Sequence, residues 1–316
     1  MQRTVLSLLL TLVIGLLFSS TAAAQFNASR GVNAPKAARP VEVVDSSTGE
    51  RRVEMQERKV DGDKFGNALG NQFDLAVDGA FDGQTVAVLH FYTGEGFDFS
   101  LPKAALAEKG FSVYRWMNQA PSPAELQEAL AKSCQLWIIS DSGRHLTDAH
   151  LKVIKDFFNA GHGVYIWGDN EPFYADANFV AEGLFGGQML GNLIGNQTVN
   201  VRSGKQTVGL MPNHDITTGL EHIYEGITIA TLQPNDALQP LIYGSAGNLV
   251  AAIYDHQGRR AVLDGGFTRL YIQWDTAGTA RYVKNSAAWL VNVERFGDKV
   301  VAKEFRKGSG GETPTR

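Results

Sequence analysis

Short apolar runs alternate with amphipathic patterns along the middle of the chain. The run Thr85–Phe91 (TVAVLHF) is followed by a helical pattern over Leu101–Lys109 and by a second apolar run over Phe111–Trp116. Two further runs, Gln135–Ser140 and Val164–Trp167, each follow another helical pattern. Apolar runs of this length, bounded by polar turns, are typical of buried strands. Strands that alternate with helices predict parallel βαβ units, and therefore a flavodoxin-like three-layer α/β/α sandwich with a mainly parallel central sheet.

The helix boundaries in this region carry their own signals. Ser122 is followed by a proline and stands three residues before Glu125, which is the pattern of a capping box with proline at the first helical position. This pattern predicts a helix that ends near Ser133. The next helix is expected to begin after Thr147 and to end at Gly161.

The second half of the chain is less periodic, and its elements follow from shorter patterns. We expect the α/β domain to span residues 84–303. The predicted elements are a helix over Ala175–Phe185, strands near Val199–Leu210, Ile223–Leu232, Leu241–Tyr243, Leu249–Tyr254 and Arg260–Asp264, and a closing helix over Thr279–Val293.

The N-terminus has the pattern of a targeting segment. Arg3, the apolar run Val5–Phe18 and the small residues Ala22–Ala24 follow the order of a secretory signal peptide over residues 1–24. The apolar run is short for a membrane span, and an uncleaved anchor is the alternative. We therefore expect a secreted or periplasmic protein with no membrane span after cleavage.

Residues 25–83 lie between this segment and the domain. The polar, proline-containing stretch 25–40 predicts a linker. Within Val41–Val60, two strand-like runs flank Ser46–Gly49, which predicts a small hairpin. At the other end of the chain, the glycine-rich residues 304–316 are expected to form a disordered tail.

Composition excludes several classes of function. Lys and Arg number 29 against 33 Asp and Glu, for a net charge of −4, so the chain has no basic surplus to bind nucleic acid. Cys134 is the one cysteine of the 316 residues, which excludes an internal disulfide and a cysteine-based zinc or iron–sulfur site. We predict no cofactor, and leave open a divalent cation bound by oxygen and imidazole ligands.

Polar residues follow several of the predicted strands directly. Ligands of open parallel sheets bind beyond the carboxyl ends of the strands. The residues at these ends are therefore candidates for binding a small polar ligand, such as a carbohydrate. The candidate ligand-binding residues are His90, Asp141, His145, Trp167, Asp169, Asn170, Glu171, Asp264 and Arg269.

The acidic members of this set have further candidate roles. Asp141, Asp169 and Asp264 are candidate ligands of a divalent cation, and Asp169, Glu171 and Asp141 are candidate catalytic groups. A purely structural role is the alternative for each. Loop Asp and Asn side chains commonly stabilise turns and cap helices, and Arg269 could simply pair with a carboxylate.

The segment Gly168–Pro172 (GDNEP) directly follows an apolar run and is the most distinctive in the chain. A glycine at this point permits a sharp turn that projects the next side chain, here Asp169, over the sheet. The aromatic residues Trp167, Phe173 and Tyr174 lie around it in the sequence. Aromatic faces beside carboxylates are a common way to hold sugars, whereas packing in the core is the more frequent role of such residues.

Several motifs occur in a characteristic order over about residues 84–295. They are Ala-Gly-His-Gly at 160–163, Gly186-Gly187-Gln188, the segment Asn213–Leu220, Tyr224-Glu225, the stretch Gly258–Asp264 and the stretch Asn285–Leu290. In this order the chain resembles the class I glutamine amidotransferase-like superfamily, and within it the trehalose-utilisation (ThuA-like) branch. The resemblance implies the α/β fold predicted above.

The chain departs from the resembled superfamily at the reactive positions. Working amidotransferases of that superfamily have a cysteine at the turn after the strand and a His–Glu pair after a late strand. Here the turn carries Asp169, and two glycines follow Asp264. Cys134 precedes the third predicted strand, at the opposite end of the sheet. Glutamine hydrolysis is therefore not predicted.

Three functions remain as hypotheses. The first is an exported amidotransferase-like protein without amidotransferase activity, which binds a small polar ligand or carbohydrate at the carboxyl ends of the strands. The second is a metal- or carboxylate-dependent hydrolase that uses Asp141, Asp169, Glu171 and Asp264. The third is a structural or assembly module of the cell envelope, which the predicted hairpin favours. The missing nucleophile favours binding over catalysis, and the oligomeric state stays open.

Overall fold

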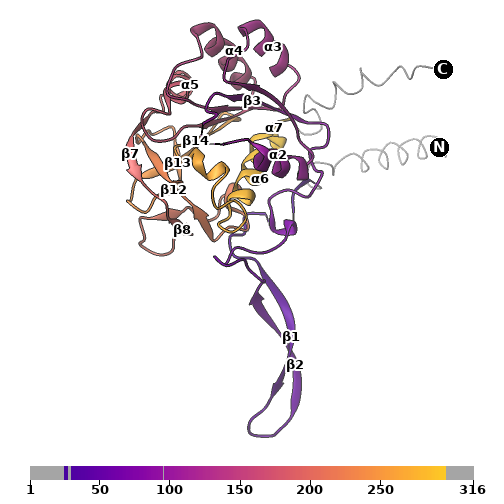
Figure 1. Cartoon of the computed structure of the whole chain (residues 1–316). Helices are drawn as coiled ribbons and strands as arrows, with labels where there is room; N and C mark the ends of the chain where they lie inside the picture. The colour runs from indigo at the N-terminus through magenta and orange to yellow at the C-terminus, as the bar shows by residue number, and fades with distance from the viewer. Residues whose placement is uncertain (1–24, 28–29, 95, 297–316) are drawn as a thin grey trace, which may run out of the picture.

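The computed structural model describes residues 25–27, 30–94 and 96–296, which form a body and a long projecting arm (Figure 1). The predicted signal peptide (1–24) and tail (304–316) lie outside the described residues. Among the described residues, no helix combines the length and the apolar character needed to cross a membrane.

A mixed sheet of eight strands forms the centre of the body, in the order β4-β3-β5-β6-β14-β13-β12-β9. The first five of these strands are parallel to one another, as predicted, and the last three pair antiparallel. The parallel strands are β3 (Thr85–His90), β4 (Ser112–Met117), β5 (Gln135–Ile139), β6 (Gly163–Trp167) and β14 (Arg259–Asp264). The antiparallel strands are β13 (Leu249–His256), β12 (Gln239–Tyr243) and β9 (Gly209–Leu210).

Helices cover both faces of the sheet, which confirms the predicted three-layer sandwich. The helices are α2 (Ser100–Glu108), α3 (Pro123–Leu130), α4 (Asp148–Asn159), α5 (Ala175–Phe185), α6 (Thr279–Leu290) and the short α7 (Val293–Phe296). Figure 1 shows α3, α4 and α5 together on one side of the sheet, and α2 and α6 on the other. Alternate side chains of β5 serve the two cores: Trp137 packs in the core under α2 and α6, and Leu136 in the core under α3–α5.

The predicted helix starts are confirmed by their hydrogen bonds. The Ser122 hydroxyl accepts from the backbone N–H of Glu125 (3.2 Å), and the Glu125 carboxylate accepts from the N–H of Ser122 (2.8 Å). At α4, Nδ1 of His150 accepts from the N–H of Thr147 (3.1 Å), while its Nε2 lies 2.7 Å from the carbonyl oxygen of Pro121. His150 is therefore a capping residue whose two ring nitrogens are both used.

Two single strands predicted in the second half are wrong. The stretch predicted as Val199–Leu210 forms β8 (Thr198–Asn200) and β9 with a loop between them, and the stretch predicted as Ile223–Leu232 forms β10 (His222–Tyr224) and β11 (Thr228–Leu232). Gly226, at φ 113°, breaks the second stretch. β10 pairs with β8, and β11 pairs with β7 (Met189–Ile194), which was not predicted. Three 3₁₀ turns complete the described elements: η2 (Asn71–Phe73), η3 (Asp215–Thr217) and η4 (Phe267–Leu270).

The predicted hairpin forms the arm, and it is longer than expected. β1 (Lys36–Val44) and β2 (Arg51–Lys59) pair antiparallel without interruption, and Figure 1 shows them extending away from the body. Because β1 begins at Lys36, the linker prediction is wrong for residues 36–40. At the base of the arm, Lys59 forms an ion pair with Glu221 of the body.

A buried charge cluster joins the segment after the arm to the body. The Asp74 carboxylate, 1% exposed, lies 2.8 Å from Lys109 Nζ, 2.8 Å from Lys284 Nζ and 2.7 Å from Arg281 Nε. Burial acts to raise the pKa of Asp74, but Lys284, Lys109 and Arg281 outweigh it and hold that pKa below its usual value. The ionised carboxylate therefore connects the N-terminal segment to α6 and to the end of α2.

Candidate functional site

The carboxyl end of β14 is closed by a buried ion pair. The Asp264 carboxylate accepts from Arg269 Nη1 (2.9 Å), from the Tyr282 hydroxyl (3.0 Å) and from the backbone N–H of Gly266 (3.0 Å). Arg269 also donates to the backbone oxygen of Glu225 (3.0 Å). Burial raises the pKa of Tyr282 well above its usual value, so its hydroxyl stays protonated and donates. Asp264 and Arg269 are thus brought together as the structural alternative anticipated, and the carboxylate is already fully engaged.

The turn after β6 is tied to this ion pair through the backbone. Gly168 donates its N–H to the carbonyl oxygen of Asp264 (2.9 Å), and the N–H of Asp169 donates to the carbonyl oxygen of Phe173 (3.1 Å). Gly168 does not have a positive φ; a Cβ there would instead clash with the side chain of Met189 and lie 3.0 Å from Cβ of Tyr174. Packing, rather than backbone strain, therefore requires this glycine.

The candidate side chains of the turn differ in accessibility. Asp169 is buried, Asn170 is half-buried and Glu171 is exposed. Asn170 Nδ2 donates to the carbonyl oxygen of Glu171 (2.9 Å), which stabilises the turn locally. Of the three, Glu171 is the residue that a ligand in solvent can reach directly.

The loop after β5 is organised by an aspartate that the sequence patterns did not single out. The buried Asp176, in the first turn of α5, accepts from the backbone N–H groups of His145 (3.0 Å) and Leu146 (2.8 Å). Its Oδ2 lies 3.0 Å from Nδ1 of His145, whose ring stacks on Phe91. Asp141 accepts from the N–H of the next residue (2.7 Å). An acidic residue in the first turn of a helix was the available signal for Asp176.

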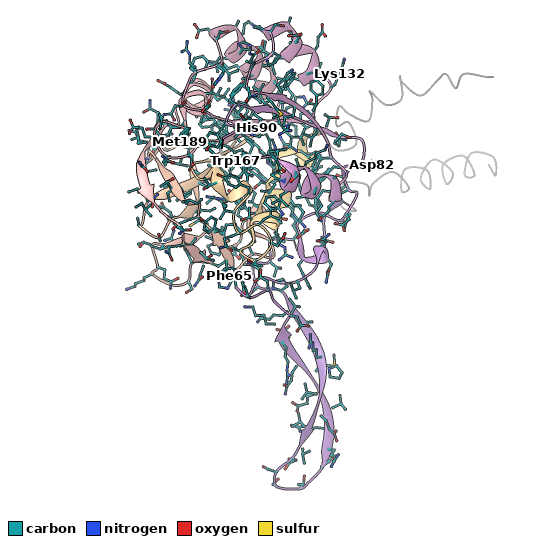
Figure 2. The ribbon with its side chains drawn as sticks, viewed as in Figure 1. Phe65, Asp82, His90, Lys132, Trp167 and Met189 are labelled. Atoms are coloured by element: carbon teal, nitrogen blue, oxygen red, sulfur yellow. The ribbon has the colours of Figure 1, made fainter. Side chains whose placement is uncertain are left out.

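Two other candidates lie in the core. His90 and Trp167 are both fully buried (Figure 2). Burial lowers the pKa of His90 to about 4, with a further contribution from Arg115, so the ring is neutral and its Nδ1, 2.9 Å from Arg115 Nη1, acts as the acceptor. Trp167 stacks on Tyr165 at 4.1 Å between ring centroids. Neither side chain reaches a surface that a ligand could contact.

The predicted cation at Asp141, Asp169 and Asp264 finds no support in the described part of the chain. No group of three or more His, Cys, Asp or Glu side chains there is arranged to hold a metal ion. Asp264 in addition has Arg269 as its counter-charge.

An open pocket of about 510 Å³ lies beside these residues, near the base of the arm, where Figure 2 labels Phe65. It is lined by four carboxamides, two aromatic rings, one lysine, one histidine and one threonine, and by no carboxylate. These residues are Lys64, Phe65, Asn196, Gln197, Thr198, Asn200, His222, Tyr224 and Gln273.

Hydrogen bonds within the wall orient two of the carboxamides. The Tyr224 hydroxyl donates to Oδ1 of Asn196 (2.8 Å), and Nδ1 of His222 lies 2.7 Å from Oδ1 of Asn200. Burial lowers the pKa of His222, so the neutral ring donates from Nδ1. The oxygen of each asparagine is used inside the wall, and its NH₂ group is the part that can donate to a ligand.

Electrostatics connect this pocket to the turn after β6. Burial raises the pKa of Tyr224 to about 12, Glu225 and Asp169 raise it further, and Arg269 opposes them. The Tyr224 hydroxyl is therefore within electrostatic range of both Asp169 and Arg269, two residues predicted from the strand ends. The remaining wall residues were missed, because an isolated Asn or Gln in a loop carries no pattern of its own.

No known family model matches the chain, and no curated protein matches it. In fold it is similar to a ThuA-like protein from Bacteroides uniformis, with 13% identity and a TM-score of 0.45 over 70% of this chain and 96% of that one. It is also similar to a ThuA-like protein from Parabacteroides merdae (11%, 0.43, 73% and 93%). A third similar structure is a GMP synthase protein from Thermoplasma acidophilum (10%, 0.38, 72% and 98%). These are proteins of the classes whose motifs the sequence resembles, and the similarity concerns the fold.

Proposed function

We propose that the protein is an exported binding protein for a small polar ligand of the carbohydrate class, without amidotransferase activity. The observation that carries this proposal is the lining of the polar pocket. Sugar hydroxyls both donate and accept hydrogen bonds, and so do the carboxamides of Asn196, Gln197, Asn200 and Gln273. An aromatic face such as that of Phe65 can cover the apolar face of a sugar ring.

The lining favours binding over glycoside hydrolysis. Hydrolysis of a glycosidic bond ordinarily needs two carboxyl groups that flank the bond. The nine lining residues include no carboxylate, and the buried Asp169 acts on the wall only through the electrostatics of Tyr224. A hydroxyl-rich ligand is therefore held but not cleaved.

The environment of Cys134 supports the absence of glutamine hydrolysis. The thiol is 1% exposed, and burial raises its pKa to about 12. Its Sγ lies 3.3 Å from the carbonyl oxygen of Thr85, the first residue of β3, and so at the amino ends of the strands. A thioester mechanism needs an accessible thiolate, which this site does not offer.

The proposal is tested by measuring the thermal unfolding of residues 25–316 with a panel of mono- and oligosaccharides, followed by calorimetric titration of those that stabilise the protein. We expect Asn196→Ala to weaken binding by at least about tenfold, because its carboxamide is lost from the wall. Gln127→Ala, on the exposed face of α3, is the matched control and should bind normally. Failure of every sugar in the panel to bind would contradict the proposal.

A second pair of substitutions separates the two possible positions of the ligand. If the sugar sits in the polar pocket, Asn196→Ala weakens binding and the double variant Asp169→Asn, Glu171→Gln has a small effect. The reverse result would move the ligand to the turn after β6, as the strand-end pattern predicts.

An assembly role is the second candidate function, because of the arm. Ala38, Pro40, Val44, Val53 and Met55 all point to one face of the ribbon, and the last three are 53%, 70% and 64% exposed. An exposed apolar face on a projecting element is typical of protein contacts. A photo-crosslinker at Val53 in cells that make the protein should then capture a second protein, whereas the same group at the exposed Arg58 of β2, on the other face, should not.

A further inference from the structure

We propose that two copies of the chain pair through the open edge of the central sheet at β4, across a two-fold axis, so that the two sheets become continuous. β4 is the last strand at this end of the sheet and pairs only with β3 among the described strands. The N–H groups of Ser112 and Asn118 donate toward β3. Because backbone groups alternate along a strand, those of Val113, Arg115 and Met117 face away from it.

This edge lacks the features that usually prevent pairing. Exposed edges are commonly protected by proline, by outward charges, by bulges or by shortness. β9, at the opposite edge, has only two residues, whereas β4 has six, with neither proline nor a register shift. Its one charged residue, Arg115, points inward: Nη1 lies 2.9 Å from His90 Nδ1, and the guanidinium lies 5.4 Å from the ring centre of Phe99.

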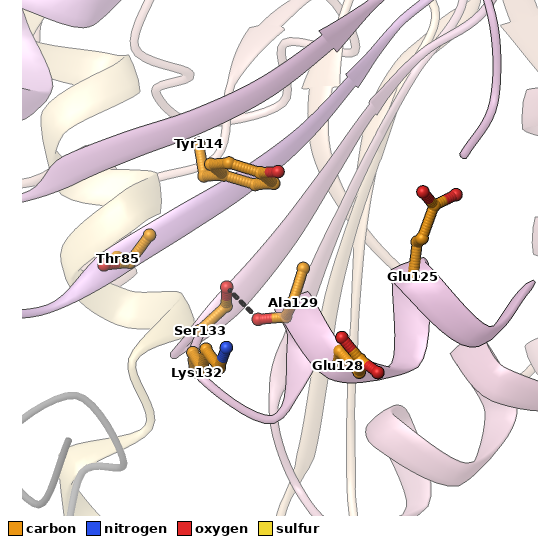
Figure 3. A pocket seen from close by; sticks show the side chains of 7 residues that line it. All are labelled: Thr85, Tyr114, Glu125, Glu128, Ala129, Lys132 and Ser133. Carbon is orange, nitrogen blue, oxygen red and sulfur yellow. Dashed lines mark hydrogen bonds between the residues drawn. The ribbon is translucent and has the colours of Figure 1, made fainter. Parts of the chain in front are cut away.

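The surface beside the edge is apolar and hollowed. Tyr114 and Met117 are 54% and 46% exposed. A cavity of about 350 Å³ lies between the edge strand and α3, and Figure 3 shows Tyr114 on the strand facing the helix across it. Glu125, Glu128 and Lys132 lie along the helical side of this cavity.

A second copy fits this edge better than an unrelated strand. An antiparallel pair centred on Tyr114 sets Val113 opposite Arg115 of the partner subunit, so the outward backbone groups of both copies meet. The same axis sets α3 antiparallel to its copy. Glu128 and Lys132 are one turn apart, so reversal sets each lysine against the partner's Glu128. A two-fold axis is also the commonest symmetry of soluble dimers.

The test is the mass of the full mature chain by sedimentation equilibrium and native mass spectrometry over a range of concentrations. We expect a dimer for the natural sequence and a monomer for Val113→Pro, which removes an outward N–H without touching the bonds to β3. Val113→Thr keeps the N–H and the β-branched shape, and should stay dimeric. A monomeric natural protein, or a Val113→Pro variant that remains dimeric, would overturn the proposal.

A charge exchange keeps the proposal testable if Val113→Pro fails to fold. Lys132→Glu should weaken the dimer by at least about tenfold, and adding Glu128→Lys should restore it, because the facing charges again have opposite signs. Loss without restoration, or no loss at all, would exclude the two-fold arrangement.

Discussion

At the scale of single residues, buried charges are stable here only because each has its partner. Asp264 and Arg269 are both fully buried and are joined at 2.9 Å. Such a pair contributes little net stability over an apolar pair of the same shape, but breaking it leaves an uncompensated charge in the core. The pair therefore determines which substitutions the carboxyl end of β14 tolerates.

We predict that Asp264→Asn lowers the free energy of unfolding by about 3–5 kcal/mol, because Arg269 would remain buried without its counter-charge. Urea unfolding followed by circular dichroism measures this loss. The exposed pair Lys152–Asp156 provides the control, since Asp156→Asn should cost less than about 0.5 kcal/mol. Equal losses at the two sites would show that the buried pair is not the cause.

The buried histidines predict a loss of stability in mild acid. Burial lowers the pKa values of His90 and His162 to about 4 in the folded protein. Between pH 6.5 and 4 only the unfolded chain takes up these protons, so each histidine lowers the free energy of unfolding by about 1.4 kcal/mol per pH unit as the pH falls.

Urea unfolding at several pH values tests the two histidines separately. His162 stacks between Phe157 and Phe296 at 4.4 and 4.8 Å. His162→Phe keeps an aromatic ring in that position and should make the pH dependence shallower, whereas His256→Gln, in an exposed position, should leave it unchanged. An unaltered slope in His162→Phe would contradict the assignment.

At the scale of elements, the arm and the body obey different physics. The body strands lie between two apolar layers, but the arm is a two-stranded ribbon whose side chains are mostly exposed. An isolated two-stranded hairpin is only marginally stable in water. The arm therefore adds little to the stability of the body.

We predict that replacing residues 36–59 by a short Gly-Ser linker changes the free energy of unfolding of the body by less than about 1 kcal/mol. Thermal and urea unfolding of the shortened chain measure this. Binding in the polar pocket is a second readout, because Lys64 and Phe65 follow the arm closely in sequence and should keep their places. A large loss of stability would mean that the arm is an integral part of the fold.

At the scale of the whole molecule, the segment between the arm and β3 is held by the charge cluster around Asp74. This carboxylate interacts with Lys109 after α2 and with Arg281 and Lys284 on α6. Three distant parts of the chain thus meet at one buried group, and the wall of the polar pocket that contains Phe65 depends on the same segment.

We predict that Asp74→Asn lowers the free energy of unfolding by about 3–5 kcal/mol, because three buried cations lose their shared carboxylate. The half-exposed Asp78, which pairs with Lys109, is the matched control, and Asp78→Asn should cost about 1 kcal/mol or less. Hydrogen exchange should show faster exchange over residues 61–82 in Asp74→Asn. Unchanged exchange there would disprove the connecting role.

Local patterns were sufficient for the first half of the fold. β3 to β6 are continuous apolar runs between capped helices, and the Ser122–Glu125 box forms as the sequence predicts. β8 and β9 were not predictable in the same way, since each has two or three residues and depends on partners far along the chain. Gly226 interrupts the apolar run at 223–232 in a way that periodicity does not reveal.

The site divides in the same way. The rule that ligands bind at strand ends was enough to select Asp169, Asp264 and Arg269, and pairing of Arg269 with a carboxylate was among the alternatives. The inward position of His90 and Trp167 was not predictable, because alternation along a buried strand does not say which polar or aromatic residue faces the core. Asp176 and the carboxamides of the pocket became visible only through their contacts.

The sequence by itself determined the class of the fold, the position of the hairpin and the absence of an accessible cysteine at the turn after β6. These features depend on local periodicity, on turn residues and on which residue types are present. The tertiary structure alone decided which charges neutralise one another, which candidates are buried and where a polar pocket opens. Such outcomes depend on contacts between residues far apart in the chain, as between Asp74 and Arg281 or between Phe65 and Tyr224.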